Sequence, residues 1–265
     1  FFAGSAFKDV AYFSRAMFME VANFFGATFD KDTVFFRAAI RSLILSNVEI
    51  PTTLNGRINF RKAKISEAHF EDIIFEKNAD FSDVRFGISL GKKHKTHKTF
   101  AVVFRSVIFK SDALFIRTRF PPHLAFEMVT FKKDADFKEA VFYPASRGLG
   151  NEKKPRFSLS FLKFNRLEIK WDQLPNLEYW VRPGQERIRS FSDTETRPSD
   201  PETKDQGEHG EQRELLSQVL KSLEENFRKL NHLDDASHAY YYMKLAQLEE
   251  VRNEDALWPR FYKEG

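Results

Sequence analysis

The phenylalanines of this chain recur at alternating steps of five and six residues, and this spacing limits the folds that the chain can adopt. The stretch FEMVTFKKDADFKEAVF carries its rings at 126, 131, 137 and 142. Most of the 30 Phe belong to blocks with the same spacing, so the underlying period is five plus six residues. The ring positions are Phe2, Phe7, Phe13, Phe18, Phe24, Phe29, Phe35, Phe70, Phe75, Phe81, Phe86, Phe104, Phe109, Phe115, Phe120, Phe126, Phe131, Phe137 and Phe142.

An α-helix does not fit this spacing. Steps of five residues place successive rings about 140° apart around a helix, which gives no single apolar stripe. Pro121 and Pro122 lie inside the most regular block, where they would break a helix. The residues between the rings also favour β-structure over helix.

Very short strands fit the spacing better. A small residue, usually Ala, Val or Thr, stands two positions before most rings, as Ala113 does before Phe115. This is a period-2 pattern that lasts three residues and then restarts. Each ring therefore predicts one short strand with its ring inward, followed by a corner.

A chain that turns a corner at every ring winds into a coil. Two units, each of five plus six residues, give a coil with four sides. Rings that are two units apart then stack at about 4.8 Å, and each buried Phe contributes about 1.5–3 kcal/mol. The predicted stacks include Phe104 on Phe126, Phe109 on Phe131, and Phe115 on Phe137.

Two further groups of residues complete the predicted repeat. Ile40, Leu45, Ile50 and Ile65 occupy ring positions where Phe is missing. Polar residues three positions before a ring are expected to form the longer, six-residue corners, because Asp and Asn favour turns. These corner residues are Asp32, Asn78, Asp112, His123 and Asp134.

The triplets ADF (79–81 and 135–137), ATF (27–29) and AVF (140–142) resemble those of pentapeptide-repeat proteins. The resemblance covers roughly residues 1–142. It implies a mainly β protein, a right-handed quadrilateral β-helix, although the alternating six-residue steps depart from the strict period of the family.

The remaining segments divide the chain into predicted regions. The solenoid with its cap covers 1–181, and the cap includes Trp171 and Trp180, because a solenoid end needs a cover. Residues 182–210 have the composition of a disordered linker. The regions that follow are a helical hairpin at 211–252 and a tail at 253–265. Three interruptions of the repeat, 51–57, 87–99 and 143–156, are expected to form loops.

Helical spacing of apolar residues predicts the hairpin, with Asp234 or Asp235 as the N-cap of its second helix. A two-helix unit is too small to bury its apolar faces well. We therefore expect it to use a further surface: a second copy of the chain, a protein partner, a domain beyond Gly265, or the solenoid end. The candidate face is Leu216, Val219, Leu223, Phe227, Tyr240, Met243 and Leu248.

The order of solenoid, Trp-containing cap and hairpin is similar to one branch of pentapeptide-repeat proteins. The matching hairpin residues are Asn226, Phe227, Leu230, Asp235, Ala236, Ala239, Tyr240 and Tyr241. In that branch a membrane ion-channel-like domain or anchor follows. The resemblance implies a cytoplasmic, membrane-linked module that is one piece of a longer protein.

Charge and motifs favour binding over catalysis. The chain has no cysteine, no phosphate-binding glycine loop and no nucleophile elbow, so neither an enzyme nor a cofactor is expected. Residues 1–181 carry 29 Lys and Arg against 20 Asp and Glu, a net charge of +9. Such a surface is suited to nucleic acid or anionic lipid, and a solenoid that mimics DNA to target topoisomerases is disfavoured. The candidate basic loop is Lys92, Lys93, His94, Lys95, His97 and Lys98.

Overall fold

The computed structural model describes residues 2–46, 51–88, 101–121, 123–142, 157–158, 162–174 and 205–255. The chain divides into two compact units, Phe1–Pro175 and Asn176–Gly265. Each unit is described by itself. The first is a parallel β-solenoid and the second contains two packed helices, so the predicted fold class is confirmed.

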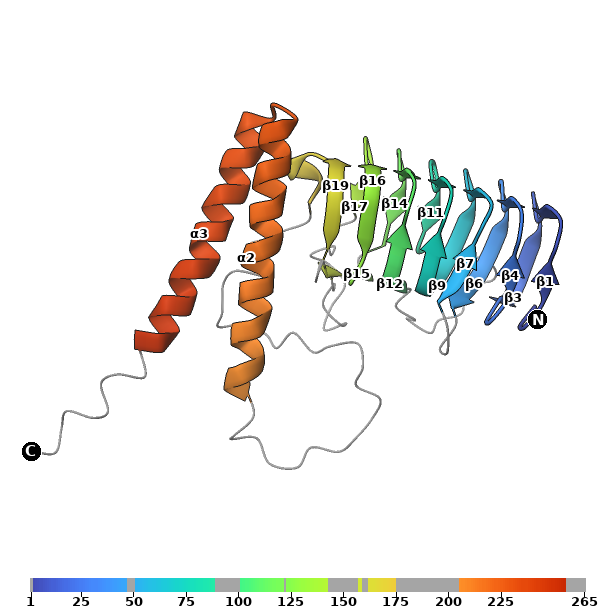
Figure 1. The fold of residues 1–265 in the computed structure, drawn as a ribbon, viewed down its shortest axis with the longest axis horizontal. Helices are drawn as coiled ribbons and strands as arrows, with labels where there is room; N and C mark the ends of the chain where they lie inside the picture. The colour runs from blue at the N-terminus through green and yellow to red at the C-terminus, as the bar shows by residue number, and fades with distance from the viewer. Residues whose placement is uncertain are drawn as a thin grey trace, which may run out of the picture. The chain divides into compact units, whose positions relative to one another are not determined.

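The solenoid consists of short strands that stack in parallel from β1 to β19 (Figure 1). The strands are β1 (Ala6–Phe7), β2 (Ala11–Tyr12), β3 (Met17–Asn23), β4 (Thr28–Phe29), β5 (Thr33–Val34), β6 (Ala39–Ser46), β7 (Thr52–Leu54), β8 (Ile58–Asn59), β9 (Lys64–Phe75), β10 (Ala79–Asp80), β11 (Arg85–Phe86), β12 (Ala101–Phe109), β13 (Ala113–Leu114), β14 (Arg119–Phe120), β15 (His123–Glu127), β16 (Thr130–Asp136), β17 (Val141–Phe142), β18 (Phe157–Ser158) and β19 (Lys163–Glu168).

The register between strands gives the coil length. Ala6 pairs with Thr28, and Val102 pairs with Leu124, so partners are two repeat units apart, as the sequence predicts. The offset is larger between Ala79 and its partner Ala113, because the chain between these residues contains an insertion. The register resumes after each insertion.

The four sides are named A to D by the inward residues that form their columns. Column C holds Phe on six consecutive coils, from Phe13 to Phe137, with adjacent ring centroids 4.6–5.1 Å apart and nearly parallel planes. The predicted stack of Phe104 on Phe126 is confirmed at 5.0 Å, with an angle of 6° between the rings. The columns are A (Phe2, Phe24, Leu45, Phe70, Phe104, Phe126), B (Phe7, Phe29, Leu54, Phe75, Phe109, Phe131), C (Phe13, Phe35, Phe60, Phe81, Phe115, Phe137) and D (Phe18, Ile40, Ile65, Phe86, Phe120, Phe142).

One interruption of the repeat was assigned incorrectly from the sequence. The stretch 51–57 was expected to be a loop, but it contains β7, and Leu54 lies buried in column B between Phe29 and Phe75. Ile50, which the spacing placed at a ring position, lies outside the described residues. Counting from the previous ring cannot locate Leu54, because the insertion before β7 changes the count.

Tight turns form the corners between sides A and B and between sides C and D, where the rings are five residues apart. The amide of Ala140 donates to the carbonyl of Phe137, and Glu139 has a φ of 57°. Positive φ at the third residue of such a turn is type II geometry. The same position is left-handed in the other described five-residue turns, at Gly4, Arg15, Gly26, Arg37, Lys62, Asp72, Asp83, Ser106, Arg117 and Met128.

The residue before the ring supports several of these turns. The side-chain oxygen of Asp80 accepts a hydrogen bond from the amide of Ser82, and Asp136 accepts one from Lys138. This explains the acid in the ADF triplets. Among the predicted corner residues of the six-residue steps, Asp134 follows the register shift where β16 passes from side B to side C, and His123 is the first residue of β15.

We expect Glu139→Gly to raise the free energy of unfolding by about 0.5–1 kcal/mol. A non-glycine residue pays a steric cost in the left-handed region, and this cost outweighs the extra freedom of glycine in the unfolded chain. Chemical denaturation measures the change. Lys138→Gly is the matched control, because Lys138 is also exposed but has no positive φ, and this substitution should destabilise the solenoid.

The C-terminal end of the solenoid is capped by one side chain. A 3₁₀ helix, η1 (Trp171–Gln173), follows β19. The side-chain amide of Gln173 donates at 2.8 Å to the carbonyls of Phe137 and Ala140. The carbonyl of Thr118, which is equivalent to that of Ala140, accepts instead from the backbone amide of Val141 on the next coil, so Gln173 takes the place of such an amide. The predicted capping role of the segment after 170 is supported by this contact, whereas Trp180 lies outside the described residues.

The second unit contains α2 (Asp205–Lys229) and α3 (Leu233–Asp255), which pack together. Asn231 has a φ of 62°, and the amide of His232 donates to the carbonyl of Phe227, so α2 ends in a Schellman motif. Two predicted boundaries were wrong. Residues 205–210 belong to α2 rather than to the linker, and α3 starts before Asp234 and Asp235, which lie in its first turn.

Candidate binding surface

One group of basic residues lies along a single edge of the solenoid, where the turns between sides C and D meet the outward positions of side D. We call this the basic edge. The acids at the same positions are Asp83 and Glu139. The basic edge consists of Arg15, Arg37, Arg61, Lys62, Lys64, Arg85, Arg117, Arg119 and Lys138.

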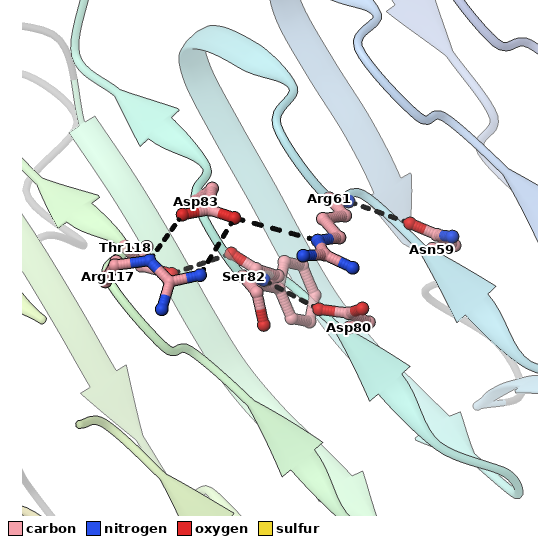
Figure 2. Close-up of polar contacts among 8 residues, drawn as sticks. Asn59, Arg61, Asp80, Ser82, Asp83, Arg117 and Thr118 are labelled. Atoms are coloured by element: carbon pink, nitrogen blue, oxygen red, sulfur yellow. Dashed lines mark hydrogen bonds and ion pairs between the residues drawn. The ribbon is translucent and has the colours of Figure 1, made fainter. Parts of the chain in front are cut away.

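Asp83 is held between two arginines of the basic edge (Figure 2). Arg117 donates to both carboxylate oxygens, with Nε 2.7 Å from Oδ1 and Nη2 3.2 Å from Oδ2, and the Nε of Arg61 lies 3.6 Å from Oδ2. The hydrogen bonds from Arg117 hold the pKa of the Asp83 carboxyl below its ordinary value. One acid therefore orders cations from two neighbouring coils.

The outward position of side D carries a ladder of cations. Lys64 pairs in register with Arg85, and Arg85 pairs with Arg119, so the three lie on consecutive coils about 4.8 Å apart. All three side chains are exposed. Among the described residues, none of them forms an ion pair. We call these three residues the side D ladder.

Other corners arrange their charges differently. Between sides B and C, and between sides A and B, acids and bases lie opposite one another on adjacent coils and form ion pairs. The net positive charge of the described solenoid is therefore least compensated at the basic edge. The pairs at the other corners include Lys8–Asp30 at 3.0 Å, Arg57–Asp32 at 2.8 Å, Lys110–Glu76 at 2.6 Å and Arg105–Glu127 at 2.8 Å.

We expect the stabilisation that Asp83 provides to disappear in acid. Its pKa is lowered in the folded state, so its contribution is present above the unfolded value of about 3.9 and is lost as the pH falls through the folded value. Asp83→Asn should therefore destabilise the protein at about pH 7, and this difference should shrink as the pH falls below the unfolded value and through the lower folded pKa. Urea unfolding at several pH values measures this, and a difference that stays constant with pH would contradict it.

The structure describes some of the predicted site residues and not others. The basic loop, Lys92 to Lys98, lies outside the described residues. In the sequence, this loop comes after the end of side D, whose inward residue on this coil is Phe86. On the helices, Leu216, Val219, Leu223, Phe227 and Met243 are buried, Tyr240 is 46% exposed, and the side chain of Leu248 is outside the described part.

The side D ladder is a set of residues that the sequence interpretation missed. Each member stands directly before an inward residue of column D, at Ile65, Phe86 and Phe120. The steps from Lys64 to Arg85 and from Arg85 to Arg119 are unequal in sequence, because the second includes an insertion, and this hides the repeat. Aligning the coils by their rings, rather than by a fixed period, would have revealed the ladder.

Fold and surface together define a β-solenoid with a basic edge and a helical hairpin. Comparisons with family models, curated proteins and solved structures find no match for this chain. Neither of the two described α-helices is long and apolar enough to cross a membrane.

Proposed function

We propose that the protein is a non-enzymatic binding scaffold whose basic edge holds a partner with clustered negative charge. The observation that carries this proposal is the side D ladder, three exposed cations in register without an ion-pair partner among the described residues. Unit charges that stand as far apart as adjacent strands, about 5 Å, would repel one another by roughly 0.8 kcal/mol even in water. A bound anionic partner would relieve this repulsion. At the other corners, acidic residues of the protein itself compensate the cations.

The fold supports a scaffold in a second way. Stacked rings fill most of the inward positions, including Phe86, Phe120 and Phe142 of column D, so the backbone that carries the cations has a spacing fixed by the coils. A rigid backbone does not have to be ordered on binding, so only the Lys and Arg side chains lose conformational freedom. The outward positions can therefore present charge at a constant interval.

The resemblance to pentapeptide-repeat proteins supports a more specific proposal for this scaffold. It suggests a module at the cytoplasmic face of a membrane, linked to a membrane or ion-channel-like domain, with its hairpin contacting a protein partner or a second copy. The alternative is a free scaffold that binds protein or nucleic acid through its basic edge. A DNA mimic is the weakest of these proposals, because the ladder residues are cationic.

Binding to polyanionic probes tests the proposed function. The full chain is titrated into a fluorescent heparin oligosaccharide, a 20-base-pair duplex and phosphatidylserine vesicles at about 100 mM salt. We expect at least one probe to bind and binding to weaken as salt rises. The variant Lys64→Gln/Arg85→Gln/Arg119→Gln should bind that probe more weakly than wild type. Failure to bind all three probes would overturn the proposal.

A further inference from the structure

Side D carries apolar residues at its two ends and cations between them. Met17 is 71% exposed, the nearby Met19 on the same strand β3 is 42% exposed, and Val141 is 43% exposed. Side D therefore holds the exposed Met17 and, in register with it, a ladder of cations, while the exposed Met19 follows the inward Phe18 at the corner between sides D and A. The outward position of this face runs in register through Met17, Ala39, Lys64, Arg85, Arg119 and Val141.

The acid next to Met19 is paired with an arginine. Glu20 follows Met19, and its carboxylate accepts a hydrogen bond from Arg41 at 3.1 Å, so the two charges compensate one another. The cation ladder begins one coil beyond Ala39. At this end of the face the carboxylate of Glu20 is therefore paired, and Arg15 of the basic edge stands two residues before Met17.

We infer that side D docks on an anionic lipid bilayer, with Met17 and Met19 entering the headgroup region and the side D ladder contacting lipid phosphates or carboxylates. This inference rests on the proposed function and names its partner. Stable association with a membrane surface requires two signals, an apolar insertion and a basic patch, and side D supplies both. Four coil steps separate Met17 from Arg119, about 20 Å, which spans several headgroups.

The same observations favour lipid over duplex nucleic acid. The phosphates of a duplex would satisfy the ladder cations, but Met17 and Met19 would have no apolar surface to contact. A β-sheet face is also flat on this scale, which matches a bilayer rather than a groove. Duplex binding is therefore treated as a competing outcome of the test.

The first experiment measures co-sedimentation of the full chain with phosphatidylcholine vesicles containing 0% or about 30% phosphatidylserine. We expect binding to require phosphatidylserine and to fall in high salt. Each basic residue near such a surface raises partitioning about fivefold, so Lys64→Gln/Arg85→Gln/Arg119→Gln should weaken it roughly 100-fold. The control Lys77→Gln/Lys132→Gln/Lys133→Gln removes the same charge from exposed residues between sides B and C, and it should have a much smaller effect.

The second experiment reports the orientation on the vesicle without altering the ladder. The chain has no cysteine, so Met17→Cys introduces a single thiol that can carry an environment-sensitive fluorophore. On anionic vesicles its emission should shift to the blue and be quenched by brominated lipid. The matched control is Thr28→Cys, at an exposed position of β4 on side B, and its emission should not change.

Each result decides the inference. Equal loss of binding in the two triple variants, or equal emission changes at positions 17 and 28, would show that side D is not the docking face. Binding to the 20-base-pair duplex without binding to anionic vesicles would overturn the lipid assignment and leave the proposed function standing. Absence of binding to duplex, heparin and vesicles would overturn both.

Discussion

Phe126→Ala is expected to lower the free energy of unfolding by about 3–5 kcal/mol. Phe126 is 2% exposed, and its ring stacks on Phe104 at 5.0 Å. It also meets Phe115, Phe120 and Phe137 edge-on, with ring centroids 6.0–6.2 Å apart. Adjacent coils cannot move together to fill the cavity, because strand pairing fixes their spacing.

Lys132→Ala is the control for the cavity and is expected to change the free energy of unfolding by less than about 0.5 kcal/mol. Lys132 lies in the next strand, β16, and is exposed. Denaturant unfolding of both variants, followed by circular dichroism, gives the comparison. Similar losses for the two substitutions would mean that the inward columns do not carry the stability of the solenoid.

Gly56→Ala is expected to destabilise the solenoid by about 3 kcal/mol, although it adds one methyl group. A Cβ at position 56 would lie 2.1 Å from the carbonyl carbon of Lys31 and 2.3 Å from the amide nitrogen of Asp32. Both atoms belong to the backbone of the preceding coil, so no side-chain movement relieves the overlap. The coils would have to separate at this corner.

The carboxylate of Asp32 makes that separation more costly. It accepts hydrogen bonds from the amide of Arg57 at 2.8 Å and from the Arg57 side chain. Gly26→Ala provides the control, since a Cβ there meets nothing within 4 Å and suffers only the strain of a φ of +64°. In thermal and denaturant unfolding, the Gly56→Ala variant should be much less stable than the Gly26→Ala variant. The reverse order of stability would contradict the close contact at Gly56.

The core of the fold could be predicted from the sequence because one residue type marks one position in the coil. Successive rings of a column, such as Phe109 and Phe131, are separated by whole coils, so spacing alone identified the stacking partners. The left-handed residues could not be predicted in this way. Arg15, Lys62 and Glu139 have no common side-chain property, since the backbone hydrogen bonds of the turn fix their φ.

The candidate surface was harder to predict for a different reason. Net charge indicated a basic solenoid, but it could not distinguish paired from unpaired cations. Arg57 and Arg85 are both exposed, yet Arg57 lies 2.8 Å from Asp32, whereas Arg85 has Lys64 and Arg119 as its register neighbours. Partners on adjacent coils are a whole coil apart in sequence, and insertions change that distance from coil to coil.

The register of the coils also determines how the number of charged residues on side D can change during evolution. Coils of different length coexist in one stack, as the pairs Val102–Leu124 and Ala79–Ala113 show, so extra codons are accommodated at corners while the ring columns remain aligned. Tandem duplication of the codons for one whole coil would add one ring to each column and one outward position to side D. A duplication in the gene can therefore change the number of charges on this face without changing how the core is packed.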